Sequence, residues 1–333
     1  MAERLKVRLE DVAQAANVSK ITVSRAFTAP DKVHPDTREH ILSVARELNY
    51  ISSSPTPSTK TPSTRTLGIV NPNMSNPFFS GITKEMTLTA RACGFEVLMF
   101  DSYESEELEN AAIARLIDYR VDAVILSVIS SDAHYHPAYF EKLAKAGIPV
   151  VLVDREINAP HHGGVYIDNL DCGYQAGAYM LRQGVKNVMV VSGPADSLVS
   201  IGRNSGIREA IGRNDTALDV YYTDFTMEPA YRHMSDYLSR HAPPAGIIGI
   251  NNQITMGILK ACYEHNVIPQ RDTLVFGIDE MPYAEVFGLD LPCIHHDIKE
   301  IGQQAVDLAL RALETRASTG PRIIVRGTLQ ARD

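Results

Sequence analysis

An alternation of short aliphatic runs with helical patterns, beginning at Leu67, constrains the fold of this 333-residue chain more than any other feature. The first aliphatic runs are LGIV (67–70), EVLMF (96–100), AVILSV (123–128) and PVVLV (149–153). Nearly continuous aliphatic strands separated by helices are typical of parallel sheets that are covered on both faces. The pattern therefore predicts an α/β body.

The alternation starts again near Val165, which indicates a second lobe of the same class. We predict strands at 165–167, 188–191, 218–222, 246–250, 274–278 and around Ile294, with helices near 169–183, 203–213, 228–241, 253–265 and 298–315. Two doubly wound parallel-sheet lobes in series form a bilobed body. Ligands of such sheets bind at the carboxyl ends of the strands, which here means the cleft between the lobes.

The N-terminal segment from Leu9 to Phe27 predicts a helix-turn-helix. Its first helix has apolar residues with helical period, and Ser19 is a good N-cap for a second helix from Lys20. A third helix begins at Pro35, a favoured residue for a first helical turn. The expected apolar centre of this all-α head is Leu9, Val12, Val23, Phe27, Ile41, Ala45 and Leu48.

The second helix of the head presents a surface that suits DNA. At about 100° per residue, Ile21 and Arg25 lie nearly opposite the buried face, flanked by Lys20, Thr22 and Ser24. Residues 1–65 contain ten Lys/Arg and seven Asp/Glu, whereas residues 66–333 contain 22 and 33. A basic head on an acidic body favours nucleic acid as the partner of the head.

Several function classes are disfavoured by the composition. The four cysteines are far apart and form no CxxC pair, so we expect reduced thiols in the core. The N-terminus lacks the apolar core of a signal peptide, and no run of about 18 apolar residues could span a membrane. We therefore expect a cytoplasmic protein.

The motifs in this order resemble the LacI/GalR (lactose-repressor) family of bacterial transcription regulators. The resemblance runs through LEDVAQAANVSKITVSRAF, LGIVNPNMSNPFFSGI, AGIPVVLVDR, GIIGINNQITMGIL and VFGIDEMPYAEV. It implies a homodimer whose two heads read the half-sites of operator DNA, and a periplasmic-binding-protein-like body that binds a small effector. It also implies a regulator, most simply a repressor, that has neither cofactor nor enzymatic activity.

The resemblance assigns roles in the head residue by residue. It places Lys20, Ile21 and Arg25 at base-reading positions, and Ser19, Thr22, Ser24 and Thr37 on phosphates. Arginine can bind a guanine edge through two hydrogen bonds, while Ile21 suits apolar contact with a thymine methyl. We therefore expect Arg25 to carry much of the sequence preference.

The resemblance also implies an effector site in the cleft. Its expected members are Asn76, Phe78, Phe79, Ser127, Asp154, Arg155, Arg203, Phe225, Asn251, Asp279 and His296. Rings, carboxylates and arginine forks suit a sugar, a sugar acid or a phosphorylated sugar, and the two arginines favour anionic effectors. Structural roles are the alternative for four of them: helix packing for Phe78 and Phe79, an ion pair for Arg155, and a satisfied buried ring for His296.

Two positions depart from the family pattern. The segment 52–66 is rich in Ser, Thr and Pro where the family has a hinge helix, and proline breaks a helix, so we predict a linker without that helix. Asn252 stands where an aspartate is usual. The domains implied are a head at 1–51, the linker, a first lobe of 67–166 with 297–322, and a second lobe of 167–296 with 323–333.

Two rival functions share parts of this pattern. A soluble or periplasmic sugar-binding protein has the same bilobed body but no DNA-binding head. A Rossmann enzyme has the same alternation, but the turn VNPNMSNPFF lacks a glycine-rich phosphate loop, and no GxSxG or HExxH motif occurs. The paired histidines at 134/136, 161/162 and 295/296 have no cysteine or carboxylate at a recognised metal-ligand spacing, so no metal site is expected.

Overall fold

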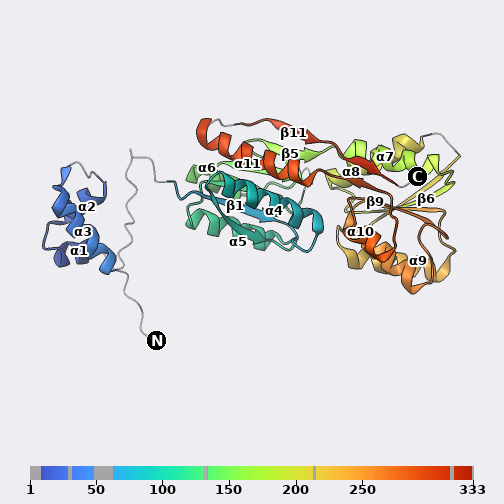
Figure 1. Ribbon diagram of the computed structural model, residues 1–333, viewed down its shortest axis with the longest axis horizontal. Helices are drawn as coiled ribbons and strands as arrows, with labels where there is room; N and C mark the ends of the chain where they lie inside the picture. The colour runs from blue at the N-terminus through green and yellow to red at the C-terminus, as the bar shows by residue number, and fades with distance from the viewer. Residues whose placement is uncertain are drawn as a thin grey trace. The chain divides into compact units, whose positions relative to one another are not determined.

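A computed structural model of the chain describes residues 9–28, 32–48, 63–130, 132, 134–212, 215–315 and 319–331 (Figure 1). The chain divides into two compact units, Met1–Pro62 and Ser63–Asp333. The first unit is the head and the second is the bilobed body.

The head contains the predicted helix-turn-helix and third helix. Helix α1 spans Leu9–Ala15, α2 spans Lys20–Thr28 and α3 spans Pro35–Glu47. Val12, Val23 and Ile41 are fully buried at their centre. The Ser19 hydroxyl accepts a hydrogen bond of 3.1 Å from the Thr22 amide, so Ser19 caps α2 as its residue type predicts. Residues 52–62 of the predicted linker lie outside the described part of the chain.

The first lobe is a six-stranded parallel sheet in the order β11-β5-β4-β3-β1-β2. Its strands are β1 (Thr66–Asn71), β2 (Glu96–Asp101), β3 (Ala123–Leu126), β4 (Val150–Asp154), β5 (Gly164–Ile167) and β11 (Arg322–Val325). Its helices are α4 (Pro77–Ala92), α5 (Glu106–Asp118), α6 (Tyr139–Ala146) and α11 (Ile298–Thr315). Helices α4 and α11 pack together, as do α5 and α6. Strands β1, β3 and β4 are almost entirely buried, as their aliphatic sequences predict.

The second lobe repeats this architecture. Its sheet order is β12-β10-β9-β8-β6-β7, with only β12 antiparallel. The strands are β6 (Asn187–Ser192), β7 (Ala217–Tyr222), β8 (Gly246–Gly249), β9 (Leu274–Ile278), β10 (Cys293–His295) and β12 (Thr328–Gln330). The helices are α7 (Asn169–Arg182), α8 (Leu198–Ile211), α9 (Met227–Arg240), α10 (Asn252–Glu264) and the short η2 (Ala284–Phe287). Two doubly wound lobes in series are thus the fold of the body.

The chain passes between the lobes at positions that differ slightly from the expected ones. Strand β5 pairs with β4, so the run at 165–167 ends the first lobe and does not begin the second. Strand β11 pairs with β5, so the last crossing follows Val325 and not residue 322. Helix α11 lies with the first lobe in Figure 1, where it packs on α4. No strand was predicted after residue 320, because β11 and β12 are short edge strands whose burial alternates.

Close packing of α7 on α8 positions the arginine side of the cleft. A Cβ added at Gly173 would lie 1.9 Å from the Arg203 carbonyl oxygen, and one at Gly206 would lie 2.0 Å from the Leu170 carbonyl oxygen. Only glycine permits this approach of two helix backbones. The register of the two helices therefore fixes where Arg203 leaves α8. None of the described helices is long and apolar enough to cross a membrane.

Candidate functional site

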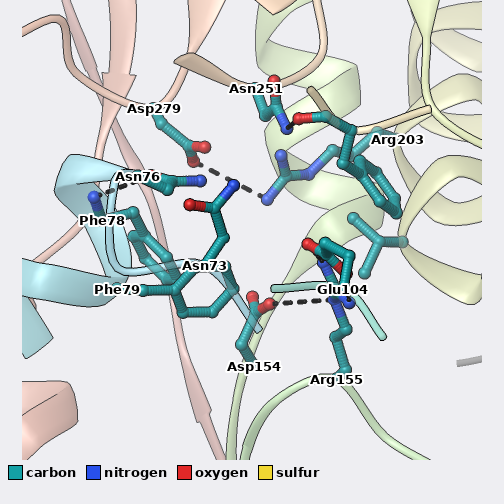
Figure 2. Close-up of a pocket in the computed structure, with 12 residues that line it drawn as sticks. Asn73, Asn76, Phe78, Phe79, Glu104, Asp154, Arg155, Arg203, Asn251 and Asp279 are labelled. Carbon is teal, nitrogen blue, oxygen red and sulfur yellow. Dashed lines mark hydrogen bonds and ion pairs between the residues drawn. The ribbon is translucent and has the colours of Figure 1, made fainter. Parts of the chain in front are cut away.

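A pocket lies between the two lobes at the carboxyl ends of their strands (Figure 2). We call it the inner pocket, and its lining is Asn73, Asn76, Phe78, Phe79, Glu104, Asp154, Arg155, Val199, Arg203, Phe225, Asn251 and Asp279. Parallel strands end at one edge of a sheet, so residues distant in sequence meet there. This edge is where the sequence placed the site.

Most of the expected effector residues line the inner pocket, but Ser127 and His296 are not among its lining residues. The His296 ring packs edge-on against Phe78 at 5.9 Å between ring centres, and its Nε2 lies 3.0 Å from Oδ1 of Asp279. Ser127 is buried directly after β3. His296 therefore supports two lining residues from behind.

The guanidinium of Arg155 is occupied by protein groups. Its Nη1 and Nη2 donate to the two carboxylate oxygens of Glu104 over 2.9 and 3.0 Å. Nη1 also donates to the carbonyls of Val128 and Ile129. The guanidinium carbon lies 5.1 Å from the centre of the Phe225 ring, which belongs to the other lobe. Burial, the largest single cause, lowers the pKa of Arg155, but the carboxylates of Glu104, Asp154 and Glu109 together raise that pKa above its ordinary value. The ion pair that was the structural alternative for Arg155 is thus present, while Arg155 also lines the inner pocket and its role as an effector ligand stays a prediction.

Arg203 is likewise anchored from the second lobe. Its Nε donates to Oδ1 of Asn169 over 2.9 Å, and its Nη1 donates to the Ile250 carbonyl. Its Nη2 lies 3.7 Å from Oδ1 of Asp279. That Asp279 oxygen is buried and also lies 3.0 Å from Nε2 of His296. Asp279 is thus held between Arg203 and His296 as a carboxylate of the inner pocket that can accept a hydrogen bond from a ligand hydroxyl.

The three carboxylates of the inner pocket all have left-handed backbone conformations. The φ angle is +55° at Glu104, +68° at Asp154 and +79° at Asp279. This region is unfavourable for non-glycine residues, and such strain gathers at binding sites. Burial is the main cause that raises the pKa of Asp154 above its ordinary value. Glu104 was not predicted, although it closely follows the strand predicted at 96–100, so its place after that strand is the signal that could have found it.

Both asparagine residues at helix starts serve the fold. Oδ1 of Asn76 accepts from the Phe78 amide over 2.9 Å at the start of α4. Asn251 caps α10 through Ile254 at 2.7 Å, and its amide donates to the Phe225 carbonyl over 3.0 Å. Asn73 and Val199 also line the pocket, although neither was predicted. Asn73 could have been found from its place directly after the first strand.

A buried hydrogen bond joins the lobes across the cleft. Nδ2 of Asn252 donates to Oδ1 of Asn76 over 2.9 Å, and both side chains are more than nine-tenths buried. Asn252 is one of the two places where the sequence departs from the pattern of the family that it resembles. An aspartate there would place a carboxylate oxygen against Oδ1 of Asn76 and could not donate while ionised.

We therefore expect Asn252→Asp to lower the free energy of unfolding of the body by about 1–3 kcal/mol, the cost of leaving a buried partner unsatisfied. Gln253→Glu makes the same amide-to-carboxylate change in the same helical turn and is the matched control, since negative charge is favoured at a helix N-terminus. Urea denaturation at neutral pH measures both. Equal stability of the two variants would show that the Asn76–Asn252 bond contributes nothing.

A second cavity adjoins the inner pocket. This outer cavity has a volume of about 290 Å³, against about 30 Å³ left free in the inner pocket. It is lined by Glu104, Ile129, Ser130, Pro194, Asp196, Ser197, Asp224, Phe225 and Thr226. Glu104 and Phe225 line both spaces, so they stand at the boundary between them.

The loop after β3 is held in place by a buried glutamate. Oε1 of Glu109 accepts from the hydroxyls of Tyr135 and Tyr139 over 2.6 and 2.7 Å, and its Oε2 accepts from the Ile129 amide over 2.8 Å. Burial is the largest cause that raises the pKa of Glu109 above its ordinary value. Because Ile129 also accepts from Arg155, this network fixes one wall of the outer cavity.

The head presents the predicted DNA face. The side chains of Lys20 and Arg25 are exposed, and Ile21 is 63% exposed although it is apolar. Lys20 forms an ion pair with Glu10 of α1. The hydroxyls of Ser19 and Thr22 form a hydrogen bond of 2.8 Å with each other at the start of α2. Each hydroxyl therefore already makes one hydrogen bond within the head. Ser24 and Thr37 are half-buried.

Comparison with known protein families and sequences gives matches over both units. The family described as bacterial regulatory proteins, lacI family, matches residues 8–53, and a periplasmic binding protein domain matches residues 67–317. The HTH-type transcriptional repressor CytR of Escherichia coli (strain K12) is 28% identical over 335 residues, covering 97% of this chain and 96% of CytR. The HTH-type transcriptional repressor PurR of Erwinia tasmaniensis is 25% identical over 326 residues, covering 96% of this chain and 94% of PurR.

Solved structures show the same fold. The transcriptional dual regulator Cra of Pseudomonas putida, in complex with fructose 1-phosphate, matches with a TM-score of 0.74 and 21% identity over 81% of this chain and 99% of Cra. The transcriptional regulator CelR in a cellobiose complex matches with a TM-score of 0.69 and 23% identity over 98% of this chain and 99% of CelR.

Proposed function

This chain belongs to the lacI family of bacterial regulatory proteins, and from that premise we propose that it is a repressor whose operator affinity changes when a neutral, polyhydroxylated small molecule binds between its lobes. It is a DNA-binding transcription regulator with a sugar effector: CytR and PurR are transcriptional repressors, and the structures of the regulators Cra and CelR are complexes with fructose 1-phosphate and cellobiose. The pairing of charges in the cleft is the observation that favours a neutral effector. Two arginines face three carboxylates there, and each arginine has a carboxylate partner.

The chemistry of the inner pocket supports a sugar in particular. Phe78, Phe79 and Phe225 line the pocket and suit the apolar side of a sugar, while the Asp279 carboxylate can accept a hydrogen bond from a hydroxyl. Two unpaired arginines would favour a sugar acid or a phosphorylated sugar. Because each arginine is paired with a carboxylate, we favour an uncharged ligand.

The mechanism is linkage between two binding sites. A free volume of about 30 Å³ holds only a few waters, so a sugar requires the lobes or their side chains to move. Residues of both lobes line the pocket, so the occupancy of the pocket and the relative position of the lobes depend on each other.

We propose a homodimer, in which lobe movement changes the spacing of the two heads. Half-exposed Leu88 on α4 and Met99 on the edge strand β2 provide an apolar surface for such pairing. Effector and operator then alter each other's affinity by the same factor.

The test begins with operator identification. DNA fragments that the full chain retains from a random pool should share a pseudo-palindromic sequence, and footprinting should show protection at both half-sites. Thermal-shift screening against neutral sugars, sugar acids and sugar phosphates then identifies ligands, and each hit is added to the footprint. A sugar that binds without changing DNA affinity would favour the alternative, a sugar-binding protein without a regulatory role. Chemical conversion of a hit would contradict the proposal that the chain is not an enzyme.

A further inference from the structure

We propose that Glu104 determines the charge specificity of the cleft: by occupying the fork of Arg155 at the boundary between the outer cavity and the inner pocket, it restricts the effector to molecules without a phosphate or carboxylate group. This inference rests on the proposed effector function and deepens it. It assigns to one residue the discrimination between neutral sugars and their anionic derivatives.

The position of Glu104 makes it the first charge of the ion pair that an entering ligand meets. The Glu104 side chain is 25% exposed, whereas the Arg155 side chain is 4% exposed. Glu104 lines both the outer cavity and the inner pocket. A ligand that passes from one space to the other therefore passes the carboxylate before it can reach the guanidinium.

The geometry of the pair leaves Arg155 no free fork. Two nearly parallel hydrogen bonds of 2.9 and 3.0 Å join the guanidinium to the carboxylate, the arrangement with which arginine also binds phosphate. Its Nε faces Asp154, with 4.0 Å to Oδ2. Phe79 and Phe225 lie near the guanidinium, at 5.8 and 5.1 Å from their ring centres. An anion could bind Arg155 only by displacing Glu104.

The outer cavity adds to the same selection. Its ionisable lining residues are Glu104, Asp196 and Asp224, and none of its described lining residues is a lysine or arginine. Like charges repel more strongly in a partly enclosed space, where the effective dielectric constant is below that of water. A phosphate in the outer cavity would thus face three carboxylates and no cationic side chain among the described lining residues of that cavity.

The other arginine cannot substitute for Arg155. Arg203 is 4% exposed at its side chain, faces Asp279 and donates to Asn169 and to the Ile250 carbonyl. Removing the charge of Glu104 would therefore leave Arg155 as the cation without a carboxylate partner at hydrogen-bonding distance. Glutamine at position 104 keeps the size of the side chain and removes that charge.

The experiment compares Glu104→Gln with the wild-type chain, using inorganic phosphate and sulfate as probes and potassium chloride at matched ionic strength as the reference. We expect no saturable rise in the thermal unfolding temperature of the wild type, and a saturable rise for Glu104→Gln with an affinity for phosphate at least about tenfold higher. Glu107→Gln is the matched control. It makes the same glutamate-to-glutamine change at an exposed residue of α5 that lines neither the inner pocket nor the outer cavity, so it should behave as the wild type.

Further variants and ligands separate the outcomes. The double variant Glu104→Gln/Arg155→Met should lose the gained phosphate binding, and retention of that binding would overturn the proposal. Glucose 6-phosphate, ribose 5-phosphate and their neutral parent sugars extend the test. Saturable binding of a sugar phosphate to the wild type, competed by a neutral sugar, would overturn the proposal even if Glu104→Gln does not fold. Failure of every neutral sugar to affect DNA binding would instead count against the proposed effector, because the phosphate measurement does not depend on it.

Discussion

Arg203→Ala should abolish sugar binding in the cleft and with it the response of DNA binding to the effector. Arg203 contacts Asn169, the Ile250 carbonyl and Asp279 at once, so its removal leaves the buried Asp279 carboxylate without its cation. Truncating one member of a buried charged pair costs about 2–5 kcal/mol, which predicts a loss of affinity of about 30-fold or more. Isothermal titration with the best neutral sugar from the thermal-shift screen measures this loss.

Controls separate a binding role from a general loss of structure. Arg208 lies on the same helix but is exposed, so Arg208→Ala should bind the sugar as the wild type does. Arg203→Lys keeps the charge but not the planar fork and should recover only part of the affinity. Both alanine variants should bind operator DNA in the absence of sugar. Unchanged sugar affinity in Arg203→Ala would rule out the inner pocket as the effector site.

Arg25→Ala should remove most of the operator preference. Arg25 is exposed on α2, next to the exposed Ile21, where a guanidinium can form two hydrogen bonds with a guanine edge. Such a pair discriminates by about 1–3 kcal/mol, so we expect the affinity for the selected operator to fall by about 5- to 150-fold, while affinity for random DNA changes much less. Titrations of both DNAs at one salt concentration measure the ratio.

Lys32→Ala is the matched control, because Lys32 is an exposed cation of the head that lies outside the three helices. Its loss should weaken binding to selected and random DNA about equally and reduce the salt dependence, as expected for a phosphate contact. Sugar binding should be unchanged in both variants. An Arg25→Ala protein with full operator preference would refute the base-reading role.

Much of the site could be predicted because parallel strands end together. The rule places the carboxyl ends of the strands of each lobe at the cleft, and the residues that the family resemblance named at the ends of β1, β4, β8 and β9 line the inner pocket there: Asn76, Asp154, Asn251 and Asp279. The resemblance also named Ser127 after β3, but Ser127 is buried and does not line the pocket. The end of a strand determines that a side chain lies at the carboxyl edge of the sheet. Whether that side chain reaches the pocket or is buried beneath it depends on the neighbouring helices.

The role of Arg155 was harder to predict than its location. An arginine after a buried strand suits either a ligand or an ion pair, and the sequence left both open. Glu104, which forms the ion pair with Arg155, is 51 positions away and follows an edge strand. The left-handed backbone at Tyr103 and Glu104 turns the chain there, and no local pattern in DSYES announces it.

The sequence by itself determined the classes of structure: a helix-turn-helix head, two α/β lobes, and a cleft at their strand ends. These follow from local periodicity and capping, which operate within one or two turns of chain. Only the tertiary structure decided which charges are paired, that Asn252 reaches Asn76 over 176 positions, and that β11 returns to the first sheet. Pairing depends on distances across the folded lobes, and because a Coulomb interaction is set by separation in space, it has no signature along the chain.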